Sequence, residues 1–239
     1  MWKGARVIVV VPAWDEAPRI GRVLVSIPDW VDAILVVDDA SRDGTGEAAR
    51  AVGDVRVEVV RHERNRGVGA AIATGYRRAL ATPGDPRDAI VVMAGDGQMA
   101  PLDLPALVDP VVRGEADYAK GDRFRSREHS AAMPVSRLAG GHVFSWATSL
   151  AIGRRVSDSQ CGYTAIARRA CASLDLDGLW PHYGYPNDIL SQLALRKLRV
   201  MEVPVRAVYA DEASRLKVRH LPMIAGIILR AYVRRVCAR

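Results

Sequence analysis

The sequence predicts an α/β protein with a mostly parallel sheet flanked by helices. Short runs of β-branched residues alternate with helical patterns through about the first 95 residues. Polar residues and glycines follow directly after these runs, as they do at the carboxyl ends of parallel strands, where such sheets bind ligands. The 239 residues are 49% hydrophobic and 26% charged, which suits one globular body.

The first half of the chain contains four expected strands and three expected helices. The run Val7–Val11 is apolar at every position, which indicates a strand buried on both faces. Turn residues at Ser41–Gly46 open a helix that ends near Val52. The expected strands cover residues 7–11, 33–37, 55–60 and 89–93, and the other two expected helices cover 17–26 and 68–80.

The second half of the chain is less regular. We expect a strand at 117–120, a helix at 135–152, a turn and strand at 160–165, a helix at 187–197 and a strand at 200–205. No linker between independent domains is visible. Residues 1–215 are therefore expected to form the body of the protein, followed by a separate C-terminal helix within residues 216–239.

Positive charge is concentrated at the C-terminus. The net charge is +7, and no acidic residue follows Glu212. The seven cations beyond that point are Arg215, Lys217, Arg219, Arg230, Arg234, Arg235 and Arg239. Residues 1–212 are therefore neutral overall, and any anionic partner belongs to the tail. Nucleic acid is not expected, because aromatic residues do not interleave with these arginines.

The tail predicts a basic amphipathic helix. Its apolar residues Leu221, Ile224, Ile227, Ile228 and Val236 favour one side, with Arg230, Arg234 and Arg235 at the polar end. Such a helix either lies in a membrane interface or docks on the body with a solvated arginine face. A truncated membrane region is a third interpretation. We expect a cytoplasmic protein, peripheral on the inner face of the cell membrane, and the three cysteines without a CxxC pair fit a reducing compartment.

Asp96 is the strongest candidate for chemistry. It follows the fourth expected strand and is flanked by Gly95 and Gly97, with Gln98 nearby. The glycines would let a diphosphate and a hard cation approach, and Mg²⁺ or Mn²⁺ is commonly held by one or two carboxylates together with substrate phosphates. The alternative is an aspartate that caps the helix starting near Pro101.

Two further sites follow the second and third expected strands. Asp38 and Asp39 end the second strand, where Asp39 could accept hydrogen bonds from a base or ribose; the alternative is a helix cap. Asn65–Ala71 precedes a helix and is an incomplete glycine fingerprint. Gly67 there either lets the backbone approach a nucleotide sugar or merely permits a tight, closely packed turn.

An aromatic segment, Trp180–Asp188, stands out in a chain that is only 6% aromatic. Its rings could form a platform for an acceptor or sugar, with Asp188 as a general base. The alternative is that Asn187 or Asp188 caps the helix that follows.

Six segments, in this order, resemble the family 2 inverting glycosyltransferases of the GT-A fold. They are VVPAWDE (10–16), VVDDASRDGT (36–45), NRGVGAAIATG (65–75), AGDGQMAP (94–101), QCGYTA (160–165) and YPND (185–188). The resemblance covers about the first 215 residues and is similar to the branch that uses dolichyl or polyprenyl phosphates. It implies a nucleotide-binding half at 1–100 and an acceptor half at 101–215.

The resemblance implies a role for each matching residue. Pro12, Ala13, Glu16, Asp38, Asp39, Gly67, Gly95 and Asp96 would bind the nucleotide sugar, while Gln98, Ser214, Arg215 and Lys217 would contact the acceptor or its phosphate. Asp96 would hold the metal, and Asp96 and Asp188 would be catalytic. The implied partners are a nucleoside-diphosphate sugar, a lipid-phosphate or glycan-hydroxyl acceptor, and a membrane surface.

One position departs from the family pattern. Ala94 stands where the first aspartate of the DxD metal motif is expected, so dependence on Mg²⁺ or Mn²⁺ is an open question. Ala94 also supports an alternative to a transferase, a catalytically weakened homologue that binds nucleotide. A second alternative is a sugar nucleotidyltransferase, because such enzymes have similar sheets; the Asp38–Asp39 and QCGYTA segments argue against it.

Overall fold

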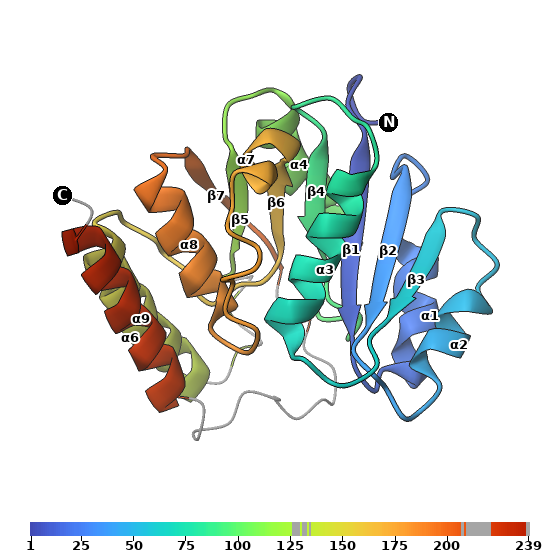
Figure 1. The fold of residues 1–239 in the computed structure, drawn as a ribbon, viewed down its shortest axis with the longest axis horizontal. Helices are drawn as coiled ribbons and strands as arrows, with labels where there is room; N and C mark the ends of the chain where they lie inside the picture. Colours follow the sequence, from blue (N-terminus) through green and yellow to red (C-terminus); the bar gives the residue numbers. More distant parts are fainter. Residues whose placement is uncertain (126–129, 131–132, 134, 207, 209–220, 238–239) are drawn as a thin grey trace.

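A seven-stranded sheet forms the centre of the protein, with helices on both faces (Figure 1). The computed structural model describes residues 1–125, 130, 133, 135–206, 208 and 221–237. The strand order is β3-β2-β1-β4-β6-β5-β7. The predicted α/β class is confirmed.

The first half of the sheet is parallel and fully built from the expected runs. Its strands are β1 (Val7–Ala13), β2 (Ala33–Asp38), β3 (Val57–Arg61) and β4 (Ala89–Val92). Every residue of β1 and β4 is buried, as their continuous apolar sequences predict. The connecting helices are α1 (Ala17–Ser26), α2 (Thr45–Arg50) and α3 (Val68–Ala81). All four parallel strands therefore end at one edge, the lower edge in Figure 1.

The second half adds three strands, one of them reversed. β6 (Thr164–Ala167) lies between β4 and β5 (Tyr118–Asp122) and is antiparallel to both, and β7 (Val200–Pro204) is parallel to β5. The sheet is thus mostly parallel, as predicted. The helix expected to start near Pro101 is present as η1 (Pro101–Asp103) followed by α4 (Leu104–Val112), whereas the short helix α7 (Arg168–Ala172) was not expected.

Helix α8 (Tyr185–Leu195) begins two residues before the predicted start. Pro186 lies in its first turn, where a missing N–H costs no hydrogen bond. Strand β3 begins two residues later than expected, because Val55 is fully exposed. Neither shift moves the polar segments, which still follow the ends of the strands as the sequence predicts.

Helix α9 (Leu221–Cys237) packs on α6 (Val135–Ile152) and α8 (Figure 1). Ile224, Ile227 and Ile228 are buried against the body, as the docked interpretation predicts. Leu221 and Val236 were predicted for the same face but are 36% and 50% exposed. None of the described helices is long and apolar enough to cross a membrane.

Candidate active site

Asp96 lies in the loop that follows β4, at the edge where the parallel strands end. The backbone N–H of Gln98 donates to Asp96 Oδ1 at 3.0 Å, and Gly97 between them has a φ of +80°, which favours glycine. Gly95 N donates to Pro12 O at 3.2 Å, and a Cβ on Gly95 would lie 3.2 Å from Ala13 Cβ. The structure thus brings Pro12, Ala13 and Gly95 together beside Asp96, and their contact with a nucleotide sugar remains a prediction.

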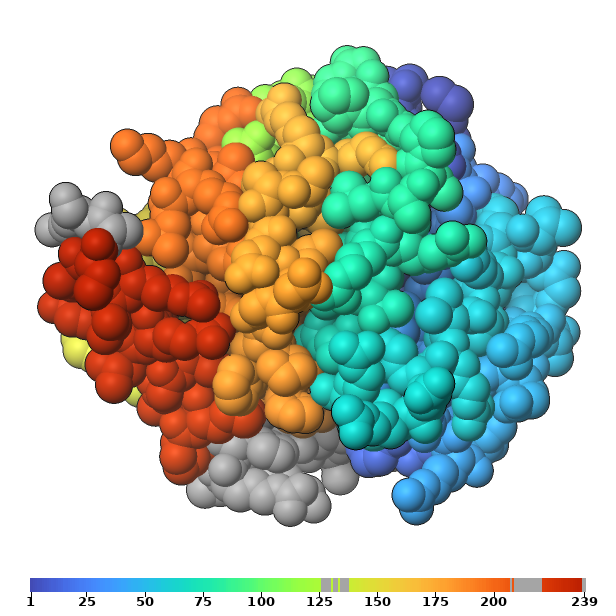
Figure 2. Space-filling view, viewed as in Figure 1, coloured from blue at the N-terminus to red at the C-terminus, as the bar shows by residue number. Residues whose placement is uncertain are grey.

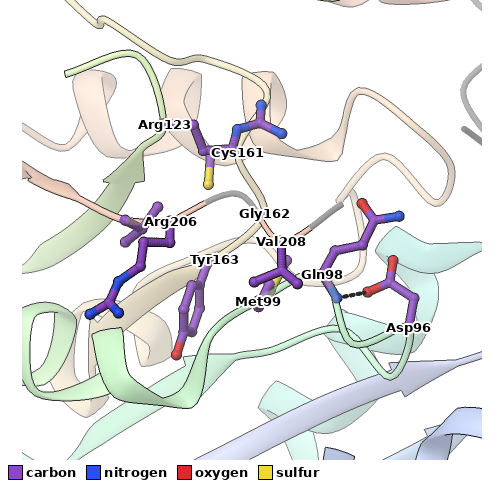
Figure 3. Close-up of a pocket in the computed structure, with 10 residues that line it drawn as sticks. Asp96, Gln98, Met99, Arg123, Cys161, Gly162, Tyr163, Arg206 and Val208 are labelled. Atoms are coloured by element: carbon purple, nitrogen blue, oxygen red, sulfur yellow. Dashed lines mark hydrogen bonds between the residues drawn. The ribbon is translucent and has the colours of Figure 1, made fainter. Parts of the chain in front are cut away.

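A small pocket beside Asp96 joins the two halves of the chain (Figure 3). Asp96 and Gln98 line one side of the pocket and the Arg123 guanidinium another. Arg206 also lines the pocket, but its guanidinium points away from Asp96 and pairs with the buried Asp103 at 3.2 Å. The remaining lining residues are Met99, Cys161, Gly162, Tyr163, Val205 and Val208. A carboxylate and an arginine that line the same pocket suit a ligand that carries both anionic phosphates and a bound cation.

Arg123 was missed by the sequence analysis, and a buried carboxylate fixes its position. Asp158 is fully buried and accepts two bonds from the Arg123 side chain, to Nε at 2.7 Å and to Nη2 at 3.0 Å. Burial raises the pKa of Asp158, but the charge and hydrogen bonds of Arg123 outweigh it, so the pKa lies below its ordinary value. The available signal was the place of Arg123 directly after a strand, at the binding edge of the sheet.

The segment QCGYTA meets the start of α8 at this pocket. A Cβ on Gly162 would lie 2.5 Å from the Tyr185 hydroxyl, so only glycine permits this approach. Burial raises the pKa of Tyr185 well above its ordinary value, and the phenol stays protonated. Beneath the same turn, the buried Lys120 Nζ donates to the carbonyl oxygen of Cys161. Two motifs that are separate in the sequence therefore form one wall of the site.

Asp38 and Asp39 are buried and hold neighbouring loops in place. Asp38 accepts from Ser41 N at 2.9 Å and pairs with Arg61 Nη1 at 2.8 Å. The partners of Asp39 are His62 Nδ1 at 2.7 Å, Arg66 N at 2.8 Å and Gly67 N at 2.7 Å. These bonds shape the predicted nucleoside pocket. Contact of either carboxylate with a base or ribose remains a prediction.

Glu16 lies at the same edge, after β1. It is buried and pairs with Arg19 at 3.1 Å, while its N–H donates to Thr45 Oγ1 at 2.8 Å. The preceding Asp15 has a φ of +51°, and its Oδ1 accepts from Arg42 N at 2.9 Å. The loops after β1 and β2 are thereby joined, which places Glu16 next to the Asp38–Asp39 segment.

Of the two roles weighed for Gly67, its contacts in the structure favour close packing. Its N–H is used by Asp39, and a Cβ there would lie 2.2 Å from His182 Nδ1 and 2.5 Å from Pro181 O. Further along, Ala70 N donates to Pro181 O at 3.1 Å. The start of α3 is therefore filled by the chain's own 180–182 loop. Close packing, the alternative weighed from the sequence, explains this glycine.

We expect Gly67→Ala to lower the free energy of unfolding by about 1–3 kcal/mol, because an alanine would combine a positive φ of +93° with a clash against His182. Gly140→Ala is the matched control, since Gly140 lies in a helix with nothing within 4 Å of its Cβ position. Urea denaturation measures both variants. An unaltered midpoint for Gly67→Ala would contradict the packing role.

Asp188, for which a general-base role remains a prediction, is engaged by the protein itself. Its carboxylate is buried, accepts from Trp180 N at 2.9 Å, and pairs with Arg230 at 2.7 Å and Arg234 at 2.8 Å on α9. A carboxylate with three internal partners is poorly placed to take a proton from an acceptor. The structure instead makes Asp188 the attachment point of the C-terminal helix. Arg230 and Arg234, predicted as part of a solvated polar end, are its partners.

The metal site is reduced to one carboxylate. Among the described residues, no group of three or more His, Cys, Asp or Glu side chains could enclose a metal ion. At position 94 the backbone N–H contacts Met99 Sδ at 3.2 Å, and the alanine supplies no ligand. A divalent cation fits here only when Asp96 and a substrate diphosphate hold it together. Ser214, Arg215 and Lys217, predicted for the acceptor phosphate, lie outside the described residues.

This fold, with an acidic loop after β4 and a reversed strand joining the two halves, defines a GT-A glycosyltransferase. The sequence pattern of "Glycosyl transferase family 2" matches residues 8–173. The chain therefore belongs to glycosyl transferase family 2, and the predicted family, fold and enzyme class are confirmed.

Named relatives extend the comparison. The chain is 27% identical over 220 residues, 86% of each chain, to UDP-N-acetylglucosamine–dolichyl-phosphate N-acetylglucosaminyltransferase of Methanococcus voltae. It is 32% identical over 211 residues, 84% of this chain and 82% of the other, to undecaprenyl-phosphate mannosyltransferase of Micrococcus luteus. It also resembles glucosyl-3-phosphoglycerate synthase of Mycobacterium tuberculosis, solved with Mn²⁺, UDP-glucose and phosphoglyceric acid. The TM-score is 0.68 and the identity 25%, covering 97% of this chain and 80% of that one.

Proposed function

We propose that this glycosyltransferase moves a sugar from a nucleoside diphosphate to a polyprenyl phosphate with inversion of configuration. The pocket lined by Asp96, Gln98 and the Arg123 guanidinium carries the proposal. Asp96 can contact a donor diphosphate through a bound cation, and Arg123 can contact an anionic phosphate directly. Both relatives named above take their acceptor from the class of polyprenyl or dolichyl phosphates, which supports this choice.

The reaction is a direct displacement at the anomeric carbon. An oxygen of the acceptor phosphate forms the new bond to that carbon as the bond to the donor diphosphate breaks, and the nucleoside diphosphate leaves with the electron pair. The acceptor oxygen is already anionic, so no general base is needed. Arg123, held rigid by Asp158, supplies positive charge where the diphosphate or acceptor phosphate lies.

We propose that Asp96 holds Mg²⁺ or Mn²⁺ jointly with the donor diphosphate. The bound cation would neutralise charge that develops on the leaving group. The similar synthase was solved with Mn²⁺ and UDP-glucose, which supports this class of ion and donor. With only one carboxylate at the site, we expect the cation to bind weakly in the absence of nucleotide.

A transfer assay tests the function directly. The full chain is incubated with UDP- or GDP-sugars, Mg²⁺ and a short-chain, water-soluble polyprenyl phosphate. The expected products are a nucleoside diphosphate and a glycosyl phosphate of inverted anomeric configuration. Release of pyrophosphate would instead indicate a nucleotidyltransferase. Nucleotide binding without transfer to any phosphate acceptor would favour the weakened homologue, the reading that Ala94 supports.

Arg123→Lys tests the cationic side of the pocket. Lysine keeps the charge but cannot make both bonds to Asp158, so we expect kcat for transfer to fall about tenfold or more. Arg199→Lys is the matched control, because Arg199 makes a similar two-bond contact with Asp117 outside the pocket. Equal transfer rates for the two variants would remove Arg123 from the mechanism.

A lipid acceptor places the reaction at a membrane surface. We propose a protein peripheral on the inner face of the cell membrane, held there through the region of the C-terminal helix. The predicted membrane face of α9 is corrected by its packing, because Ile224, Ile227 and Ile228 are buried in the body. A different surface must therefore meet the lipid.

A further inference from the structure

Helices α6 and α9 each present a second apolar row to solvent. The row on α6 consists of Val143, Trp146 and Leu150, and the row on α9 of Leu229, Tyr232 and Val233. The spacing of three and four residues places each row along one side of its helix. These six side chains, together called the α6–α9 outer face, are between 47% and 67% exposed.

The two rows lie on neighbouring helices. Helices α6 and α9 pack against each other at the end of the molecule remote from β3 (Figure 1), and one side of α9 is exposed at the surface in Figure 2. Arg235 links the rows, since its Nη1 donates to Leu150 O at 2.8 Å and its guanidinium lies 5.7 Å from the Tyr232 ring. Exposed apolar rows on two adjacent helices are a candidate docking site.

The charge around this face identifies the kind of partner. Residues 135–155 and 221–239 contain no aspartate or glutamate. Arg154, Arg155 and Arg235 lie at the C-terminal ends of the two helices. A second copy of the chain, related by a two-fold axis, would bring the same cations together, which opposes self-association. An anionic surface complements them, and Trp146 and Tyr232 are of the residue types enriched at membrane interfaces.

We propose that the α6–α9 outer face docks on the interface of a bilayer that contains anionic lipids. The proposal rests on the proposed lipid-phosphate acceptor. Both helices begin at the edge of the molecule where β1 and β4 end (Figure 1). With the two helix axes in the membrane plane, the Asp96 edge opens beside the lipid headgroups, and a membrane-bound acceptor reaches it without leaving the bilayer.

Sedimentation of the full chain with vesicles tests the face. Vesicles of phosphatidylcholine and phosphatidylglycerol should bind the protein more tightly than vesicles of phosphatidylcholine alone. Trp146→Glu and Tyr232→Glu should each weaken binding to the anionic vesicles about tenfold or more, because each replaces an inserted aromatic ring with a repelled charge. Val55→Glu is the matched control: Val55 is equally apolar and fully exposed, but precedes β3 at the far end of the sheet.

Two results would overturn the proposal. One is equal vesicle binding by Trp146→Glu and Val55→Glu. The other is a wild-type dimer in the absence of vesicles that Trp146→Glu dissociates in analytical ultracentrifugation, which would assign the face to a second copy. Transfer to the short-chain acceptor is measured without vesicles and is therefore independent of both results. Its loss in the wild type would refute the proposed function, whereas missing vesicle binding with intact transfer would refute the docking face alone.

Discussion

Asp96→Asn should lower kcat/KM for sugar transfer about 10²–10³-fold and leave the fold intact. Asparagine keeps the Oδ1 that accepts from Gln98 N, so the loop after β4 retains its shape. What disappears is the single negative charge with which the site can hold a divalent cation against the donor diphosphate. Stabilisation of the leaving group weakens accordingly. Initial rates with a saturating short-chain acceptor measure the effect.

Asp29→Asn provides the control for this experiment. Asp29 is fully exposed, and its carboxylate lies 4.0 Å from the Arg56 guanidinium. The same change of charge there should leave transfer unaltered. Calorimetric titration of the nucleoside diphosphate with and without Mg²⁺ separates binding from catalysis. If Asp96→Asn transfers sugar as fast as the wild type, the leaving group is stabilised by other residues and Asp96 is only a loop cap.

The parallel half of the fold was predictable because local sequence decides it. Val7–Val11 and Ala33–Val37 are β-branched or aliphatic at every position, and both form buried strands. The polar residues after them follow from the direction of the strands, so Asp38 and Asp96 were found without a structure. The roles considered for Ala94 and Asp96 could also be predicted without a structure, because they depend only on the spacing within one motif.

Long-range pairing explains what the sequence left hidden. The sequence Thr164–Ala167 does not reveal that β6 is antiparallel to both of its neighbours. The direction of a strand depends on the edge at which the chain re-enters the sheet. Arg123 and Asp158 are 35 residues apart, and only the fold brings them together. The local sequence around Gly67 would be the same whether the turn binds a phosphate or packs against another loop. The structure decides between them because His182 lies there.

Asp188→Asn should destabilise the protein by about 1–3 kcal/mol and detach α9 more readily, without abolishing transfer to a soluble acceptor. The buried carboxylate holds Arg230 and Arg234, and its loss leaves two partly buried guanidinium groups without a counter-charge. Both arginines are about one-third exposed, so water reduces the cost below that of a fully buried pair. Urea unfolding gives the stability, and transfer rates are compared where both proteins are fully folded.

Asp117 offers a matched control because it plays the same structural part elsewhere. Its carboxylate is also buried and pairs with two arginines, Arg169 and Arg199. Burial raises its pKa, but the bonds from Arg199 and Arg169 outweigh this and hold the pKa at about 2. Its stabilising contribution is therefore present above its unfolded pKa, near 3.8, and is lost as the pH falls through about 2.

Comparison of Asp188→Asn with Asp117→Asn shows whether Asp188 is a structural anchor for α9 or a general base. If Asp188 only anchors α9, Asp188→Asn and Asp117→Asn lose similar stability and keep similar kcat. If Asp188 takes a proton from the acceptor, Asp188→Asn alone loses about 10²–10⁴ in kcat, and the acidic limb of its pH profile disappears. The geometry favours the first result, since an anionic phosphate acceptor needs no base and all three partners of Asp188 belong to the protein itself.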